Sequence, residues 1–92
     1  MNDFSFTVSP EAAASIHDEG LVILHIGSGQ VYTSNSTGAR IWLAVERKLS
    51  LEAIAKEISA AFQIALTTAR EHAVRFLAEL EQHALIQQEV AS

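Results

Sequence analysis

The chain has 92 residues, 49% of them hydrophobic, so we expect a single domain over 1–92 with its core from about residue 4 to 86. It contains no cysteine, which excludes disulfides and thiolate metal sites and favours a cytoplasmic protein. The net charge of −5 is spread over both halves and gives no basic surface for nucleic acid.

Three segments of the first half predict strands. Residues 4–9, FSFTVS, alternate apolar and polar side chains and predict a first strand that Pro10 ends. Residues 10–20 predict either a helical turn or a turn that redirects the chain. The apolar run 21–26, LVILHI, predicts a buried strand and is too short to span a membrane. A tight hairpin at GSG then leads to a third strand over 30–34, QVYTS.

Three helices should follow these strands. Asn35, Ser36 and Thr37 are suitable N-caps for a helix through ARIWLAVERK, with Ile41, Trp42 and Val45 facing inward. Ser50 should cap a second helix, over 51–62, whose apolar residues form one stripe.

The pattern TARE, 68–71, fits a capping box in which Thr68 and Glu71 open a third helix. Residues 87–92 have little to bury and should fray. The predicted fold class is α+β: a three-stranded antiparallel sheet followed by three helices, winged helix-turn-helix-like.

No pattern of catalytic or metal-binding residues stands out. His72 and His83 would lie roughly 16 Å apart along a helix, too far to share an ion. No pairing of a nucleophile with a base is suggested, because the serines, threonines and carboxylates lie on predicted surfaces or at caps, so we expect no enzyme. The GSG segment precedes a strand and not a helix, which favours a hairpin over a phosphate site. We therefore expect no catalytic residue, metal or cofactor.

The third helix is a poor candidate for reading DNA. It carries Glu71, Glu79 and Glu81 against two arginines, and a helix among phosphates should have the opposite sign. A winged-helix DNA-binding regulator is nevertheless the alternative function.

The third predicted strand has an uncharged edge. No charged residue and no proline occurs between Gln30 and Thr37, although edge strands usually carry such protection. The strand could simply be short, or its edge could be kept open for an extended peptide. The residues alone leave these two interpretations equal, and a homodimer through the same edge is a third.

An ordered series of segments resembles the PqqD family. GSGQVY, Asn35, TGARIW, SLEAIAKEISAAF and FLAELEQHALI follow one another between about residues 20 and 86. That family contains the pyrroloquinoline quinone (PQQ) biosynthesis chaperone and related precursor-peptide recognition elements. Tyr32 and GARIW are closer to the stand-alone lasso-peptide type. Three positions depart from the family pattern, where Leu, Asp and Gly are common: Ser34, His72 and Ala84.

The resemblance implies a non-catalytic protein that binds the leader of a ribosomally made precursor peptide. The leader would add as a strand to the third strand, against the third helix, and be presented to a radical-SAM enzyme or a leader protease. From the charge and from the short apolar runs, we expect no nucleic-acid partner and no membrane partner. The implied peptide-binding residues are Gln30, Val31, Tyr32 and Thr33 on the strand, and Arg70, Ala73, Val74 and Leu77 on the helix.

Overall fold

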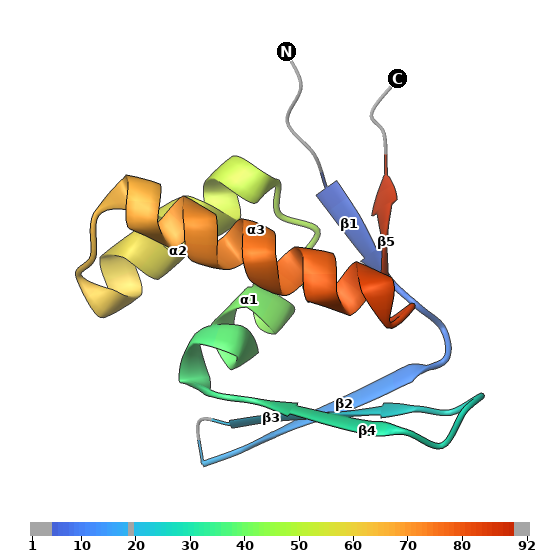
Figure 1. The fold of residues 1–92 in the computed structure, drawn as a ribbon. Helices are drawn as coiled ribbons and strands as arrows, with labels where there is room; N and C mark the ends of the chain where they lie inside the picture. The colour runs from blue at the N-terminus through green and yellow to red at the C-terminus, as the bar shows by residue number, and fades with distance from the viewer. Residues whose placement is uncertain (1–4, 19, 90–92) are drawn as a thin grey trace.

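The computed structural model describes residues 5–18 and 20–89. It confirms the α+β class, with a three-stranded antiparallel sheet and three helices (Figure 1). The elements in chain order are β1 (Ser5–Val8), β2 (Ala12–His17), β3 (Gly20–His25), β4 (Val31–Ser34), α1 (Ser36–Glu46), α2 (Leu51–Phe62), α3 (Leu66–Gln82) and β5 (Ile86–Glu89). None of the helices in the described part of the chain is long and apolar enough to cross a bilayer.

The strand order of the main sheet is β2-β3-β4, so its first strand is not the one that the sequence predicts. The segment AAASIH, which we expect to form a turn or a helical turn, pairs along its whole length with β3, from Ala12↔His25 to His17↔Gly20. Alanine has a low strand propensity, but the apolar strand beside it provides the pairing partner, and tertiary context outweighs propensity. Asp18, with φ of 48°, lies in the turn between the two strands.

The predicted first strand exists but belongs to a second, two-stranded ribbon. β1 pairs antiparallel with β5, from Ser5↔Glu89 to Val8↔Ile86. The expectation that residues 87–92 fray is therefore wrong for 87–89, while 90–92 and Phe4 lie outside the described residues. The partner of β5 comes from the other end of the chain, and the side chain of Ile86, the first residue of β5, is buried in the core.

The core lies between the helices and the inner face of the main sheet. As expected, Ile41, Trp42 and Val45 of α1 are buried, each with 1% exposure. Leu21 and Ile23 reach them from β3, and the same cluster includes Phe6, Ile54, Ile58, Ala69, Ala73, Leu77, Leu80, Leu85 and Ile86. β3 is the central strand of the sheet and pairs with β4, while α2 packs against both α1 and α3, so these two elements hold β4 and α3 in place.

Two of the predicted caps are present and one is not. Asn35 Oδ1 accepts from Gly38 N at 3.0 Å, and Ser50 Oγ accepts from Ala53 N at 3.2 Å. The helix α3 begins at Leu66, so Thr68 lies within its first turn and the predicted capping box does not form. The preceding connection fixes this start, because Ile64 N donates to Ser59 O and Ser59 Oγ donates to Ile64 O.

Candidate functional site: a groove beside an open sheet edge

β4 lies at the edge of the main sheet, and half of its main-chain groups point away from β3. His25 N donates to Gln30 O at 2.8 Å, and hydrogen-bonded pairs alternate with non-bonded ones along an antiparallel ladder. The groups of Tyr32 and Ser34 therefore face β3. The N–H and C=O groups of Val31 and Thr33 face the open edge.

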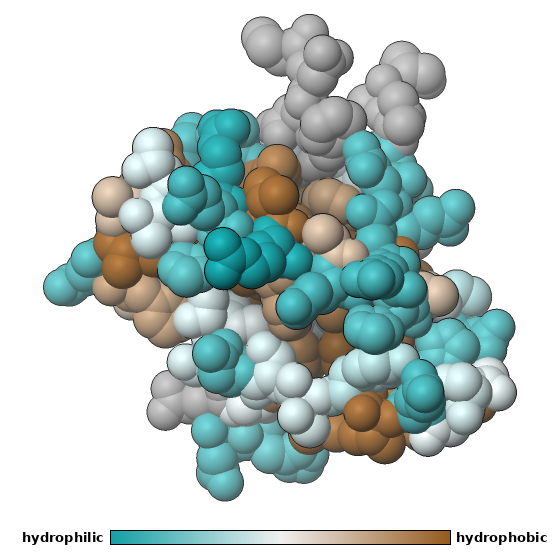
Figure 2. Space-filling model, in the orientation of Figure 1, coloured by the Kyte–Doolittle hydropathy of each residue, from teal (hydrophilic) through white to brown (hydrophobic). Residues whose placement is uncertain are grey.

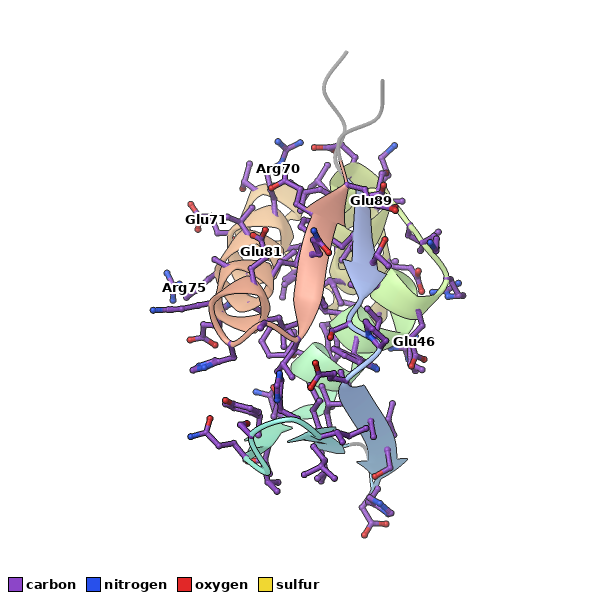
Figure 3. All side chains as sticks on the ribbon, turned by 90° about the vertical axis from the view of Figure 1, so that its right-hand side faces the viewer. Glu46, Arg70, Glu71, Arg75, Glu81 and Glu89 are labelled. Carbon is purple, nitrogen blue, oxygen red and sulfur yellow. The ribbon has the colours of Figure 1, made fainter. Side chains whose placement is uncertain are left out.

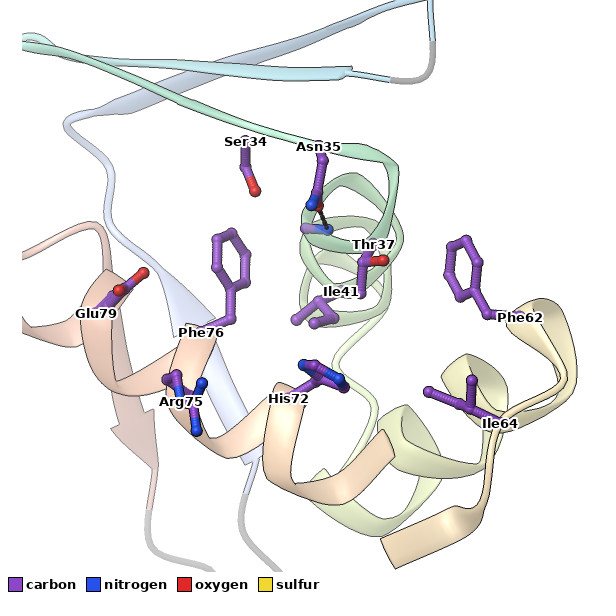
Figure 4. Close-up of a pocket in the computed structure, with 11 residues that line it drawn as sticks. Ser34, Asn35, Thr37, Ile41, Phe62, Ile64, His72, Arg75, Phe76 and Glu79 are labelled. Atoms are coloured by element: carbon purple, nitrogen blue, oxygen red, sulfur yellow. Dashed lines mark hydrogen bonds between the residues drawn. The ribbon is translucent and has the colours of Figure 1, made fainter. Parts of the chain in front are cut away.

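A groove runs along α3, from β4 to the start of α1 and the end of α2, and it contains two pockets. We call the first the Phe76 pocket, with a volume of about 350 Å³ (Figure 4). A cavity of about 150 Å³ already holds a benzene ring, so this pocket can accept a large side chain. Its apolar lining is Ile41, Phe62, Ile64 and Phe76, and its polar lining includes His72, Arg75 and Glu79.

The second pocket, which we call the His83 pocket, lies toward the C-terminal end of α3. It has a volume of about 260 Å³, and its lining includes Ile23, Tyr32, Leu80, His83 and Leu85. The rings of Tyr32 and His83 lie 4.6 Å apart, and Tyr32 Oη donates to Gln30 Oε1 at 2.5 Å. These contacts fix the Tyr32 ring against the end of α3.

The two pockets share a boundary formed by Ser34, Phe76 and Glu79. In Figure 4 the Phe76 ring points from α3 toward the end of β4, where the Ser34 hydroxyl faces it. Figure 2 shows polar atoms along α3 and apolar atoms recessed between that helix and the strands below. The groove is thus an apolar recess with a polar rim.

Gly38 permits the close approach of the three elements around the Phe76 pocket. A Cβ atom at Gly38 would lie 2.0 Å from Ser34 Oγ and 3.0 Å from Phe76 Cζ. Any side chain there would push the end of β4 or the Phe76 ring outward. The departure at position 34, serine in place of the family's leucine, is consistent with this tight packing.

The structure places the eight predicted peptide-binding residues in different surroundings. Val31, Tyr32 and Thr33 lie in the edge strand, where the main-chain groups of Val31 and Thr33 face outward, and Gln30 precedes it and accepts from Tyr32 Oη. The predicted helix residues line neither pocket: Arg70 forms an ion pair with Glu52 of α2, Ala73 and Leu77 are buried in the core, and Val74 is exposed elsewhere.

The groove is lined by a neighbouring face of α3. Residues that share this face are His72, Phe76, Glu79 and His83, with Arg75 at its margin. They follow the 3 and 4 spacing of a helix face, which is the signal that could have revealed them. The core face of α3 is more apolar than the groove face. It is the buried stripe through Ala69, Ala73, Leu77 and Leu80.

The described residues include no group of three or more His, Asp or Glu side chains that could hold a metal ion. His25 has a local structural role, since its Nδ1 accepts from the backbone N–H of Ser28 at 3.1 Å in the β3–β4 hairpin. The chemistry that the site offers is therefore main-chain pairing, apolar pockets and a few charges.

The sequence profile of one family, described as coenzyme PQQ synthesis protein D (PqqD), matches residues 20–86. The chain belongs to the PqqD family. The match covers β3, β4, all three helices and the start of β5, and so contains the whole groove. No match was found among curated protein sequences.

Two solved structures are similar to this PqqD-family protein. One is TbiB1 in complex with the TbiA(beta) leader peptide, with a TM-score of 0.82, 25% identity, and coverage of 88% of this chain and 94% of that one. The other is a lasso peptide synthetase B1 complexed with the leader peptide, with a TM-score of 0.82, 22% identity, and coverage of 90% and 98%.

Proposed function

We propose that this PqqD-family protein is a non-catalytic chaperone for a ribosomally made precursor peptide. The leader of the precursor binds in extended form along the open edge of β4, with side chains in the two pockets of the groove. The observation that carries the proposal is the uncharged open edge beside an apolar recess. Family membership and two similar proteins in complexes with leader peptides support it.

Both parts of the groove are needed for useful affinity. Val31 and Thr33 offer four outward groups, and at about 0.5–1.5 kcal/mol per hydrogen bond they contribute roughly 2–6 kcal/mol. Two buried apolar side chains add about 1.5–3 kcal/mol each. Association also costs several kcal/mol in lost translational and rotational freedom. Neither the hydrogen bonds nor the buried side chains alone therefore reach the binding free energy of a micromolar complex, about −8 kcal/mol.

The partner enzyme in this proposal is a leader protease of a lasso-peptide pathway, with a radical-SAM enzyme as the second option. The resemblance of both solved structures to this chain favours the first, because one is a lasso peptide synthetase B1 and both contain a leader peptide. The protein holds the leader and the enzyme acts on the precursor, in the cytoplasm.

The decisive variant is Val31→Pro, which removes an amide from the open edge without removing one from the ladder with β3. We expect it to abolish binding of labelled synthetic leader peptides, taken from any short open reading frames close to the gene of this protein. The far-ultraviolet circular dichroism of the helices should be unchanged.

The matched control is Val31→Ala, which keeps the amide and should bind the leader with an affinity close to that of the parent protein. Fluorescence anisotropy titrations compare the three proteins. Equal affinity of Val31→Pro and the parent protein would rule out binding along the edge of β4.

A further inference from the structure

We infer that the groove selects leaders carrying an aspartate or glutamate at the position that meets Arg75, next to an apolar residue that fills the Phe76 pocket. The inference rests on the proposed function, and it assigns a specificity-determining residue to the same site. Its basis is the environment of Arg75 compared with that of the other arginine of α3.

Arg75 extends outward from α3 on the side of the molecule where β4 has its open edge (Figure 3). It lines the Phe76 pocket, but within the described residues its guanidinium group has no hydrogen-bond or ion-pair partner. Arg70, in contrast, forms an ion pair with Glu52 on α2. One arginine of α3 therefore joins two helices, and the other is available at the mouth of a pocket.

The two acidic residues nearest to Arg75 along the helix do not neutralise it. Glu71 and Glu79 lie one turn before and one turn after Arg75, and the structure shows no ion pair between it and either. An arginine can bind a carboxylate through two parallel N–H groups, so a peptide carboxylate is the matching ligand.

Glu79 makes this preference depend on position. It lines both pockets, whereas Arg75 lines only the Phe76 pocket. A carboxylate placed next to Glu79 would be repelled, and one placed next to Arg75 would be attracted. The pair therefore favours an acidic residue at one position of the bound peptide and disfavours it toward the His83 pocket.

The exposure of Arg75 sets the size of the expected loss in peptide affinity. Arg75 is on the surface, where ion pairs are screened by solvent, so we expect loss of the charge to weaken binding about 1.5- to fivefold. The effect should decrease as salt is added.

The test is selection from a phage-displayed library of short linear peptides of random sequence, using the parent protein and the variants Arg75→Gln and Arg75→Glu. The matched control is Arg70→Gln, which removes the same charge from the same helix outside the groove. Recovered peptides are compared by the residues enriched next to their shared apolar position. Circular dichroism checks that all variants are folded.

We expect enrichment of aspartate and glutamate with the parent protein and with Arg70→Gln, no such enrichment with Arg75→Gln, and enrichment of lysine or arginine with Arg75→Glu. Peptides that bind the parent protein but show no acidic preference, or the same preference with Arg75→Gln, would overturn the inference and leave the proposed function in place. If Val31→Pro recovers the same peptides as the parent, the proposed function fails as well.

Discussion

Three residues other than glycine adopt the left-handed conformation at helix ends. Lys48, Gln63 and Ala84 have φ values of 60°, 54° and 60° and follow α1, α2 and α3. After α3, Leu85 N donates to Leu80 O and Ala84 N donates to Glu81 O, which is the Schellman pattern. Since this conformation is unfavourable for residues with a Cβ atom, each end retains local strain.

Ala84→Gly should stabilise the protein. Relief of the left-handed strain gains roughly 1–2 kcal/mol, and the greater flexibility of glycine in the unfolded chain offsets part of it, so we expect a net gain of about 0.5–1 kcal/mol. Ala84 is exposed, so no packing is lost. Urea unfolding measures the change.

The control for this substitution is Ala78→Gly, also exposed but inside α3, where glycine should cost about 1 kcal/mol. If Ala84→Gly lowered stability as Ala78→Gly does, the strain at position 84 would not exist.

Local signals in the sequence predict some residues well and others not at all. Asn35 and Ser50 are caps as predicted. A short polar side chain before an apolar stripe can accept a hydrogen bond from a free N–H group of the first helical turn. The left-handed residues carry no comparable signal, since lysine, glutamine and alanine are ordinary helix residues. The family's glycine at position 84 is the one clue to such a helix end.

The elements whose partners lie close in the sequence are predicted better than those whose partners are distant. The β3–β4 hairpin and the three helices have local signatures of turn, cap and periodicity. The ribbon of β1 and β5 joins segments almost a whole chain length apart, so no local pattern reports it. The face of α3 that lines the groove is set by how the helix packs on α2 and β5, which the sequence stripe alone does not determine.

The ribbon is part of the core and should contribute to stability. Phe6 of β1 is 6% exposed and belongs to the main hydrophobic cluster. We expect Phe6→Ala to destabilise the protein by about 3–5 kcal/mol, measured as the change in the free energy of unfolding in urea.

The comparison for this variant is Val31→Ala, at a side chain that is 58% exposed, which should change stability by no more than about 0.5 kcal/mol. A loss at Phe6 as small as that at Val31 would mean that the ribbon is dispensable for the fold.

The charge of the whole molecule makes a DNA-binding role testable. The net charge is −5, and the exposed side of α3 carries Glu71, Glu79 and Glu81. Of these glutamates, Figure 3 labels Glu71 and Glu81. We expect no retardation of duplex DNA in a gel-shift experiment at low salt, where even non-specific binding by a basic protein is strong. A retarded band that disappears as salt is raised would support the regulator alternative instead.

The pairing of β1 with β5 brings Ser5 next to Glu89, and in Figure 1 this ribbon lies on the side of the helices away from the main sheet. Anything attached through either end of the described chain is therefore attached at nearly the same point, far from β4. An enzyme domain, a surface for immobilisation or a reporter protein could be joined there without covering the groove. The fold would serve equally as a free-standing chaperone or as a recognition module carried by a larger enzyme.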